Sequence, residues 1–156
     1  MVAPSASART TPTGDMLENG FSTLITIASD VDIDFWEKTV QPPGLDGGDS
    51  VDVTTMHNTT WRTRAPSALV DLTESTATAA YDPAVYDQIV AIINTETTIT
   101  ITFPDGSTLA FYGYLRTFEP GDNAEGENPE ATVTITPTNR DLSTGTEEEP
   151  VYTAPA

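Results

Sequence analysis

Alternation of apolar and polar positions is the main signal in this sequence, and it is clearest from Thr98 to Phe118, TITITFPDGSTLAFYGYLRTF. Two β-rich runs flank Pro104-Asp105-Gly106, a tripeptide that favours a type I turn followed by a glycine with positive φ. Closing the hairpin with Phe103 and Ser107 brings the apolar positions of the two runs opposite each other, in the pairs Ile99 with Phe111 and Ile101 with Leu109. The return strand is longer than the first, so another strand must pair with its end.

Similar patterns predict further strands at Phe21 to Ser29, Asp30 to Trp36, Val51 to Met56, a short segment around Leu69, Val70 and Leu72, and Ala131 to Pro137. The first of these has apolar residues on both faces, which predicts burial on both sides within a sandwich or an assembly. The last is the expected partner of the unpaired overhang. Between them, Thr39 to Ser50 has two prolines and three glycines in twelve positions, which predicts a long loop.

One helix is expected, from Asp82 to Asn94. Asp82 is a good N-cap and Pro83 suits the first helical position. The apolar residues of its predicted buried face are Val85, Ile89, Ile92 and Ile93. With threonine abundant elsewhere, the fold class is mainly β, and we expect a β-sandwich with this single helix beside it.

The 156 residues are enough for one domain with extensions. Residues 1–19 are small, polar and interrupted by proline and glycine, which predicts a flexible N-terminal arm. Residues 20–140 form the expected β-domain, and the acidic residues 141–156 are expected to be a flexible C-terminal segment. No run of 18 apolar residues is present, and the first residues lack an apolar stretch, so we expect neither a membrane segment nor a secretory signal.

The net charge of −18, from 24 acids and 6 bases, argues against binding to a nucleic-acid backbone. High acidity also confers solubility and is typical of salt-adapted proteins, so it does not by itself indicate a function. Strict alternation places Asp30, Asp32 and Asp34 on one face of their strand. That face is either an ordinary solvent-exposed one or a surface selected to be negative.

Candidate catalytic and metal-binding residues are few. There is no cysteine, and His57 is the only histidine, without a Gly-x-Ser-x-Gly elbow that would support a serine triad. Asp46, Asp49 and Asp52 lack the EF-hand order of ligands, and the glycines among them lack the lysine of a phosphate loop. No pair of acids stands out for glycosidic chemistry. We therefore expect no catalytic residue, metal or cofactor, and a structural protein rather than an enzyme.

Two sets of residues are better explained by packing than by catalysis. Trp61 is expected to be a core or interface anchor, as are Trp36, Tyr112 and Tyr114. Arg62 and Arg64 lie on one face of their segment, where they can neutralise nearby acids.

The order of elements resembles a known family. An N-terminal arm, strands separated by a long loop, one helix, and a hairpin continuing as FYGYLRTFEPGD and GENPEATVTITPTN resemble the major tail tube proteins of long-tailed, siphovirus-type bacteriophages. The resemblance covers about Phe21 to Arg140 and rests on pattern, with Leu109 to Thr138 as its most specific part.

This resemblance implies a β-sandwich subunit that closes into a hexameric ring, with sheets joined across subunits into one barrel and rings stacked into a tube. The implied partners are other copies of the chain, the tape measure, terminator and distal tail proteins, and double-stranded DNA in transit without specific binding. The implied location is the virion tail, assembled in the host cytoplasm, and the family implies no catalytic residue and no membrane contact.

Alternation and loop composition then suggest roles within such a tube. Asp30, Asp32 and Asp34 are the candidates for the lumen. The candidates for contacts between rings are Pro42, Pro43, Gly44, Leu45, Asp46, Gly47 and Gly48. The alternatives are a tail terminator or head-tail connector, a non-viral β-sandwich binding module and, more distantly, a small hydrolase.

Overall fold

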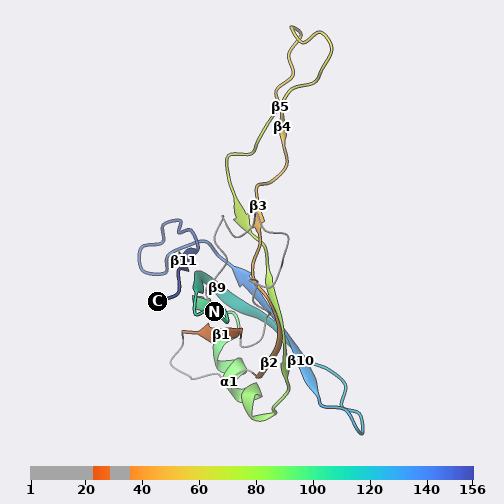
Figure 1. Ribbon diagram of the computed structural model, residues 1–156, viewed down its shortest axis with the longest axis vertical. Helices are drawn as coiled ribbons and strands as arrows, with labels where there is room; N and C mark the ends of the chain where they lie inside the picture. Colours follow the sequence, from red (N-terminus) through yellow and green to blue (C-terminus); the bar gives the residue numbers. More distant parts are fainter. Residues whose placement is uncertain (1–22, 29–35) are drawn as a thin grey trace.

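The computed structural model describes residues 23–28 and 36–156, and there the expected mainly β class is confirmed (Figure 1). The strands are β1 (Leu24–Ile27), β2 (Trp36–Gln41), β3 (Leu45–Asp46), β4 (Val51–Asp52), β5 (Arg64–Ala65), β6 (Asp71–Leu72), β7 (Ser75–Ala80), β8 (Thr97–Thr102), β9 (Thr108–Pro120), β10 (Glu130–Pro137) and β11 (Val151–Thr153). The one helix within these residues is α1 (Ala84–Ile92).

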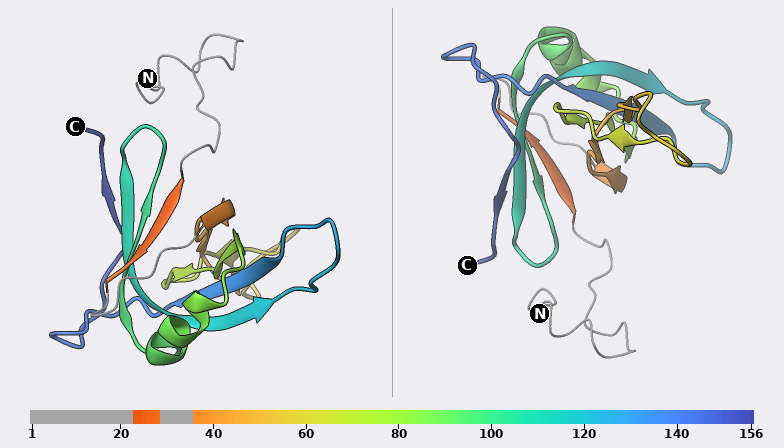
Figure 2. Two further views of the ribbon diagram at one scale, coloured as in Figure 1. Left: turned by 90° about the horizontal axis from the view of Figure 1, so that it is seen from below. Right: turned by 90° about the horizontal axis from the view of Figure 1, so that it is seen from above.

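Seven strands form one antiparallel sheet in the order β1-β8-β9-β10-β7-β2, with β11 added beside β9. Figure 2 shows that this sheet is bent into two halves, so that it resembles a sandwich made from a single sheet. The two end strands approach each other, because the backbone N–H of Ile25 in β1 donates to Glu37 Oε1 in β2 at 2.9 Å.

The hairpin of β8 and β9 has the expected register, with Ile99 opposite Phe111 and Ile101 opposite Leu109. Phe103 N–H donates to the Ser107 carbonyl at 2.9 Å, and Gly106 has φ of 87°. The Asp105 carboxylate adds contacts that the turn pattern did not indicate, since it accepts hydrogen bonds from both the N–H and the hydroxyl of Ser107. These bonds hold the pKa of Asp105 below its ordinary value.

The overhang of the hairpin is also confirmed. The second half of β9 pairs with β10, from Gly113 opposite Pro137 to Pro120 opposite Ala131. Gly113 is opposite Thr97 of β8 as well, so it is the point where β9 passes from one half of the sheet to the other. A Cβ atom there would lie 2.8 Å from the Thr136 carbonyl oxygen, which explains why a residue without a side chain is needed.

The core lies inside the bend and follows from the alternation of the strands. Its largest fully buried apolar side chains are Ile99, Ile101, Leu115, Val133 and Ile135. Helix α1 adds Ile89 and Ile92 to the same cluster. Burying side chains of this size stabilises a fold by about 1.5–3 kcal/mol each before the cost of ordering the chain.

The helix is shorter than expected. Asp82 Oδ1 accepts the Ala84 N–H at 3.0 Å, and Pro83 already has helical dihedral angles, as the capping pattern indicated. The expectation that Ile93 lies on the buried face was wrong, because the chain leaves the helix there with ψ of 136° and the side chain is exposed.

Several strand expectations need correction. Leu24 is 51% exposed, so β1 is buried on one face only, while Phe21 and the segment 30–35 lie outside the described residues. The expected loop 39–50 contains the end of β2 and all of β3. Strand β7 was missed, because its sequence STATAA combines small residues with threonine and has no large apolar side chain.

The C-terminal segment 141–156 was expected to be flexible, but its last strand, β11, pairs with β9. The pairing joins Val151 with Ala110 and Thr153 with Thr108. This edge of β9 is free because β10 reaches only as far as Gly113. A free strand edge is a ready partner for another strand, whatever the charge of the residues that precede it.

Gly113→Ala is expected to destabilise the subunit by about 1–3 kcal/mol, because the added methyl group collides with backbone rather than with a mobile side chain. Equilibrium unfolding in urea measures this change. Gly47→Ala is the matched control, since no heavy atom lies within 4 Å of a Cβ built there. Equal stability of the two variants would contradict the close approach of β9 and β10.

Candidate functional site

A long hairpin projects from the body of the molecule and is its most prominent feature (Figure 1). This projecting hairpin, residues 42–74, continues from β2 and returns into β7. It is held together by two short ladders, β3 with β6 and β4 with β5. Twelve residues separate Leu45 from His57 at the tip, so the hairpin reaches at most about 40 Å beyond its base.

The base of the projecting hairpin contains the residues predicted to contact neighbouring rings, Pro42 to Gly48. Gly44 N–H donates to Thr73 Oγ1 at 2.8 Å, and Thr73 N–H donates to the Gly44 carbonyl at 2.9 Å. Gly48, with φ of 73°, donates its N–H to Asp46 Oδ1. The segment is therefore a bonded part of the hairpin, although most of its side chains are exposed.

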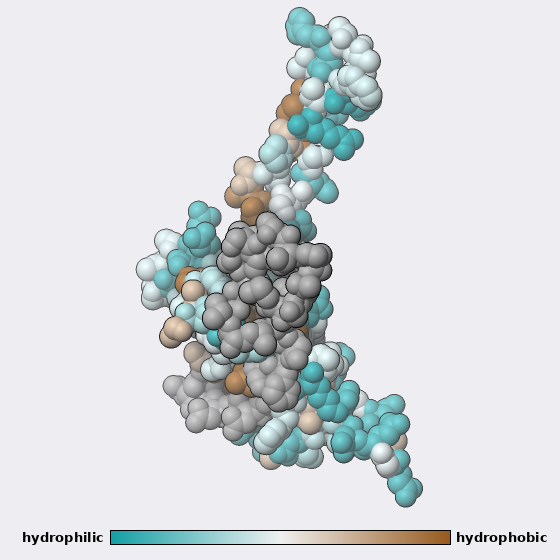
Figure 3. Space-filling model, viewed as in Figure 1, coloured by the Kyte–Doolittle hydropathy of each residue, from teal (hydrophilic) through white to brown (hydrophobic). Residues whose placement is uncertain are grey.

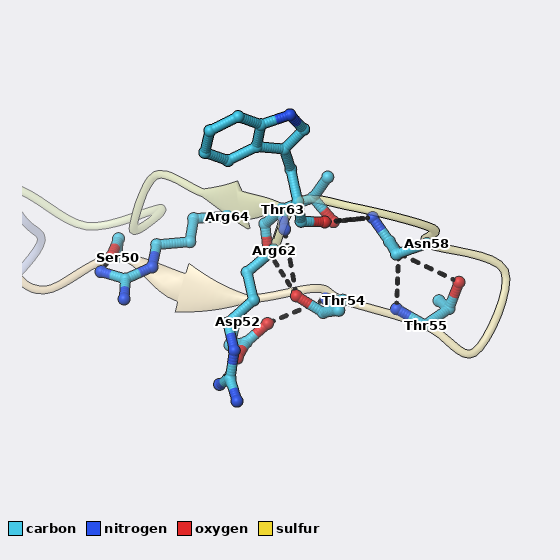
Figure 4. A network of polar contacts seen from close by, with 9 residues as sticks. Ser50, Asp52, Thr54, Thr55, Asn58, Arg62, Thr63 and Arg64 are labelled. Carbon is cyan, nitrogen blue, oxygen red and sulfur yellow. Dashed lines mark hydrogen bonds and ion pairs between the residues drawn. The ribbon is translucent and has the colours of Figure 1, made fainter.

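The tip is organised by one side chain, that of Asn58 (Figure 4). Its Oδ1 accepts the Thr55 N–H at 2.9 Å, and its Nδ2 donates to the Trp61 carbonyl at 2.9 Å. Below it, Thr54 Oγ1 accepts the Thr63 N–H at 3.0 Å. The loop thus has a defined shape although it has no core beneath it.

Asp52 connects this tip to the ladder below. Its Oδ1 accepts the Thr54 N–H at 2.9 Å, and its carboxylate lies 3.5 Å from Arg62 Nη1. Hydrogen bonds from the Thr54 side chain and then from its backbone hold the pKa of Asp52 below its ordinary value. Arg64, the other base of the tip region, points instead to Ser50, 3.5 Å away (Figure 4).

Large apolar side chains are exposed along the projecting hairpin (Figure 3). They are Leu45, Val51, Val53, Met56, Trp61, Leu69 and Val70. A two-stranded hairpin cannot cover such residues by itself. A series of exposed apolar side chains of this length indicates a contact surface.

The four residues expected to be anchors fall into two groups that differ in exposure. Trp36, at the start of β2, is 68% exposed, and Trp61, near the tip, is 81% exposed, so neither belongs to the core of this subunit. Tyr112 and Tyr114 are half-buried and alternate along β9 with the buried Phe111 and Leu115. They therefore lie on the face of the sheet that is turned away from the core.

Most positive charges of the described residues are neutralised within the subunit. Four of the five bases there each form an ion pair with one acid, whereas the acids in the same residues number nineteen. The pairs are Lys38 with Glu130, Arg62 with Asp52, Arg116 with Glu74 and Arg140 with Glu96. The surface therefore stays strongly negative. The proposed lumen residues Asp30, Asp32 and Asp34 lie outside the described residues.

Within residues 23–28 and 36–156, no group of three or more histidine, cysteine, aspartate or glutamate side chains could hold a metal ion. His57 is exposed at the tip, where its backbone N–H donates to Thr55 Oγ1 at 3.3 Å. A hollow at the base of the projecting hairpin combines apolar side chains, among them Leu45, Val70 and Leu72, with acids from Glu147 to Glu149. In the same part of the chain, no helix has the length and apolar character needed to span a membrane.

Sequence reasoning missed the projecting hairpin as a unit. It indicated a strand from Val51 to Met56, but the ladder there has only Val51 and Asp52. Two-residue ladders leave no periodic pattern to detect. The signal that was present is Asn58, a residue type that frequently bonds nearby backbone in turns, located midway between strands β4 and β5.

No protein-family model and no curated protein sequence matches the chain. Solved structures do match it in fold. A chain from the tail of an empty gene transfer agent particle with C6 symmetry has a TM-score of 0.62 at 12% identity, covering 88% of this chain and 99% of that chain. A chain from the native gene transfer agent virion has a TM-score of 0.59 at 15% identity, covering 88% and 99%.

A third match is a chain from the anti-feeding prophage baseplate, with a TM-score of 0.53 at 9% identity, covering 85% of this chain and 92% of that chain. At these identities the likeness concerns the fold. The chain thus has the fold of proteins from phage-like tail particles over nearly its whole length.

Asn58→Ala is expected to open the tip while leaving the body intact, because it removes the bonds to Thr55 and to the Trp61 carbonyl. Hydrogen exchange at the Thr55 amide should become faster, while the free energy of unfolding should change by less than about 0.5 kcal/mol at this exposed site. Asn58→Asp keeps the acceptor but lacks the donor, so its exchange should be intermediate. If the Thr55 amide exchanges at the same rate in Asn58→Ala as in the original protein, Asn58 does not hold the tip closed.

Thr54→Val is expected to raise the pKa of Asp52 towards its ordinary value, since the hydroxyl is the largest cause of the lowering. A lowered pKa means that the interactions of ionised Asp52 are present above the ordinary pKa and are lost as the pH falls through the lowered one. NMR titration of the Asp52 carboxyl measures the shift. Thr59→Val changes the same tip outside this network and should leave the pKa of Asp52 unchanged. If Asp52 titrates equally in the original protein and in both variants, the Thr54 hydroxyl is not the cause of the lowered pKa.

Proposed function

We propose that this chain is a structural, non-enzymatic subunit of a phage-like tail tube. The observation that carries the proposal is its fold, shared over 88% of the chain with a protein from a C6-symmetric tail. In this proposal the chain forms hexameric rings that stack into a tube. The tube is part of the virion tail, is assembled in the host cytoplasm and serves as a conduit for DNA ejection.

Sheet edges supply the means of ring formation. β2 ends the seven-stranded sheet on one side, and β11 pairs only with β9. Open edges attract further strands, and ring closure removes such edges. We propose that neighbouring subunits meet along these strands, with the exposed Trp36 and the outward-facing Tyr112 and Tyr114 in the contacts between subunits.

Stacking of rings is assigned to the projecting hairpin. Its base contains Pro42 to Gly48, the residues that we propose from the sequence for contacts between rings, and Leu45 there is 73% exposed. Trp61 extends the same apolar surface towards the tip. Covering these side chains in the assembly gives the hairpin the apolar partner that it lacks in the single subunit.

The negative net charge of the chain supports a role as a conduit for DNA. Six copies at −18 give −108 per ring, and a lumen lined by carboxylates offers DNA phosphates no cation to bind. Asp30, Asp32 and Asp34 are our candidates for that lining. DNA would be in transit without specific binding, and the remaining partners would be the tape measure, terminator and distal tail proteins.

Electron microscopy of the purified protein tests the proposal. We expect long hollow tubes built of stacked rings. Isolated rings would instead favour a tail terminator or head-tail connector, and a protein that stays monomeric at high concentration would favour a non-viral β-sandwich binding module.

Replacing Asp30, Asp32 and Asp34 with lysine is expected to leave tubes intact but to make them retain DNA, because cations in the lumen would bind phosphates. Co-sedimentation of tubes with linear DNA at several salt concentrations measures the retention. Lysines at Glu147, Glu148 and Glu149 change the charge equally and serve as the control. Equal retention by the two variants would place the lumen elsewhere.

A further inference from the structure

The two ends of the molecule carry opposite local charge. Residues 51–65 of the projecting hairpin contain two arginines and one acid, Asp52, which is paired with Arg62. The acidic loop, residues 119–130, contains five acids and no base. Figure 1 places the tip of the hairpin at one end of the long axis and the acidic loop, between β9 and β10, at the other.

The tip combines cations with exposed apolar groups. The Arg62 side chain is 78% exposed although it is near Asp52. Arg64 points to Ser50, on the body side of the β4–β5 ladder, and makes no ion pair among the described residues (Figure 4). Trp61 is 81% exposed and Met56 fully so. Arginine and tryptophan are the residue types most enriched at the energetic centres of protein interfaces.

The tip is also preformed. Val53 N–H donates to the Thr63 carbonyl at 3.0 Å, and Asn58 fixes the turn above it. Less conformational freedom is therefore lost when the tip binds than for an unstructured loop. These features describe a surface ready for a partner that is negative and accessible.

The acidic loop has that chemistry. The loop is closed at its base by Gly121 N–H, which donates to the Glu130 carbonyl at 2.7 Å. Glu130 is paired with Lys38, but the other four acids of the loop form no ion pair among the described residues. Figure 3 shows this end of the molecule as almost entirely hydrophilic.

We propose that the tip of the projecting hairpin of one copy docks on the acidic loop of another copy in the next ring, with Arg62 and Arg64 facing Glu125 and Glu127. This inference rests on the proposed function and names the contact by which rings stack. Because the two surfaces lie at opposite ends, the contact is head to tail and does not close on itself. Such contacts generate open-ended assemblies.

A second copy fits the tip better than DNA does. Phosphates would also attract two arginines, but a chain with a net charge of −18 repels DNA as a whole. The same charge would keep copies apart unless the few available cations were placed where subunits meet.

Reversing the charge of the tip tests the proposal. We expect Arg62→Glu with Arg64→Glu to raise the protein concentration needed for tubes at least tenfold while single rings still form. Negative-stain electron microscopy and sedimentation measure tube formation, and circular dichroism checks the fold. Arg62→Lys with Arg64→Lys should assemble within about threefold of the original protein, because it keeps the positive charge that attracts the acidic loop.

Reversing both partners supplies the decisive comparison. Glu125→Arg with Glu127→Arg should also block stacking, and the protein with all four changes should recover it. Tubes that form equally well from every variant would overturn this inference and leave the proposed function standing, whereas an original protein that forms no tubes would overturn both. If Arg62→Glu with Arg64→Glu blocks stacking and the protein with all four changes does not recover it, the acidic loop is excluded as the partner of the tip.

The remaining possible outcome is that the tip binds DNA and not a second copy of the chain. If tubes persist in Arg62→Glu with Arg64→Glu while salt-sensitive retention of DNA by the original protein disappears, the tip is a DNA contact and the docking proposal is wrong. Higher salt should weaken stacking of the original protein, because the contact joins exposed opposite charges.

Discussion

The fold depends on the fact that β9 pairs with different strands along its two halves. Its first half pairs with β8 and β11 and its second half with β10, and the change occurs at Gly113. A thirteen-residue strand that passes through both halves of a bent sheet keeps one core continuous. The buried isoleucines of β8 and the buried residues of β10 then face the same interior. The same bend brings the two end strands of the sheet, β1 and β2, close to each other.

The parts predictable from the sequence are those fixed by local chemistry. Pro104-Asp105-Gly106 determines the hairpin register, and the length of the strand after it required a partner that proved to be β10. The parts not predictable depend on distant contacts. β7 has no large apolar residue but is buried between β2 and β10. β11 pairs with an edge of β9 that is distant in sequence, since Val151 is opposite Ala110. For the candidate site, Trp36 and Trp61 were expected to be core or interface anchors, but nothing in the periodicity showed that Trp61 is exposed on a projecting hairpin.

The body and the projecting hairpin differ in how their charged and apolar side chains are covered. The body neutralises bases by pairing them internally, as Lys38 does with Glu130 and Arg140 with Glu96. The projecting hairpin instead exposes an arginine and apolar groups at once. Interfaces between proteins have this composition more often than free surfaces do. The projecting hairpin has the least core of its own, and it also has the most features of a contact surface.

The two ladders of the projecting hairpin are separated by residues without strand pairing, 47–50 on one side and 66–70 on the other. Unpaired backbone bends more easily than a hydrogen-bonded ladder, so we expect the hairpin to bend at this interval, as at a joint, and not within either ladder. A contact made at the tip would persist while the bodies of two subunits tilt against each other. In a stack of such subunits, curvature of the whole filament would be absorbed at these joints, and the sheets that enclose the channel would remain undistorted.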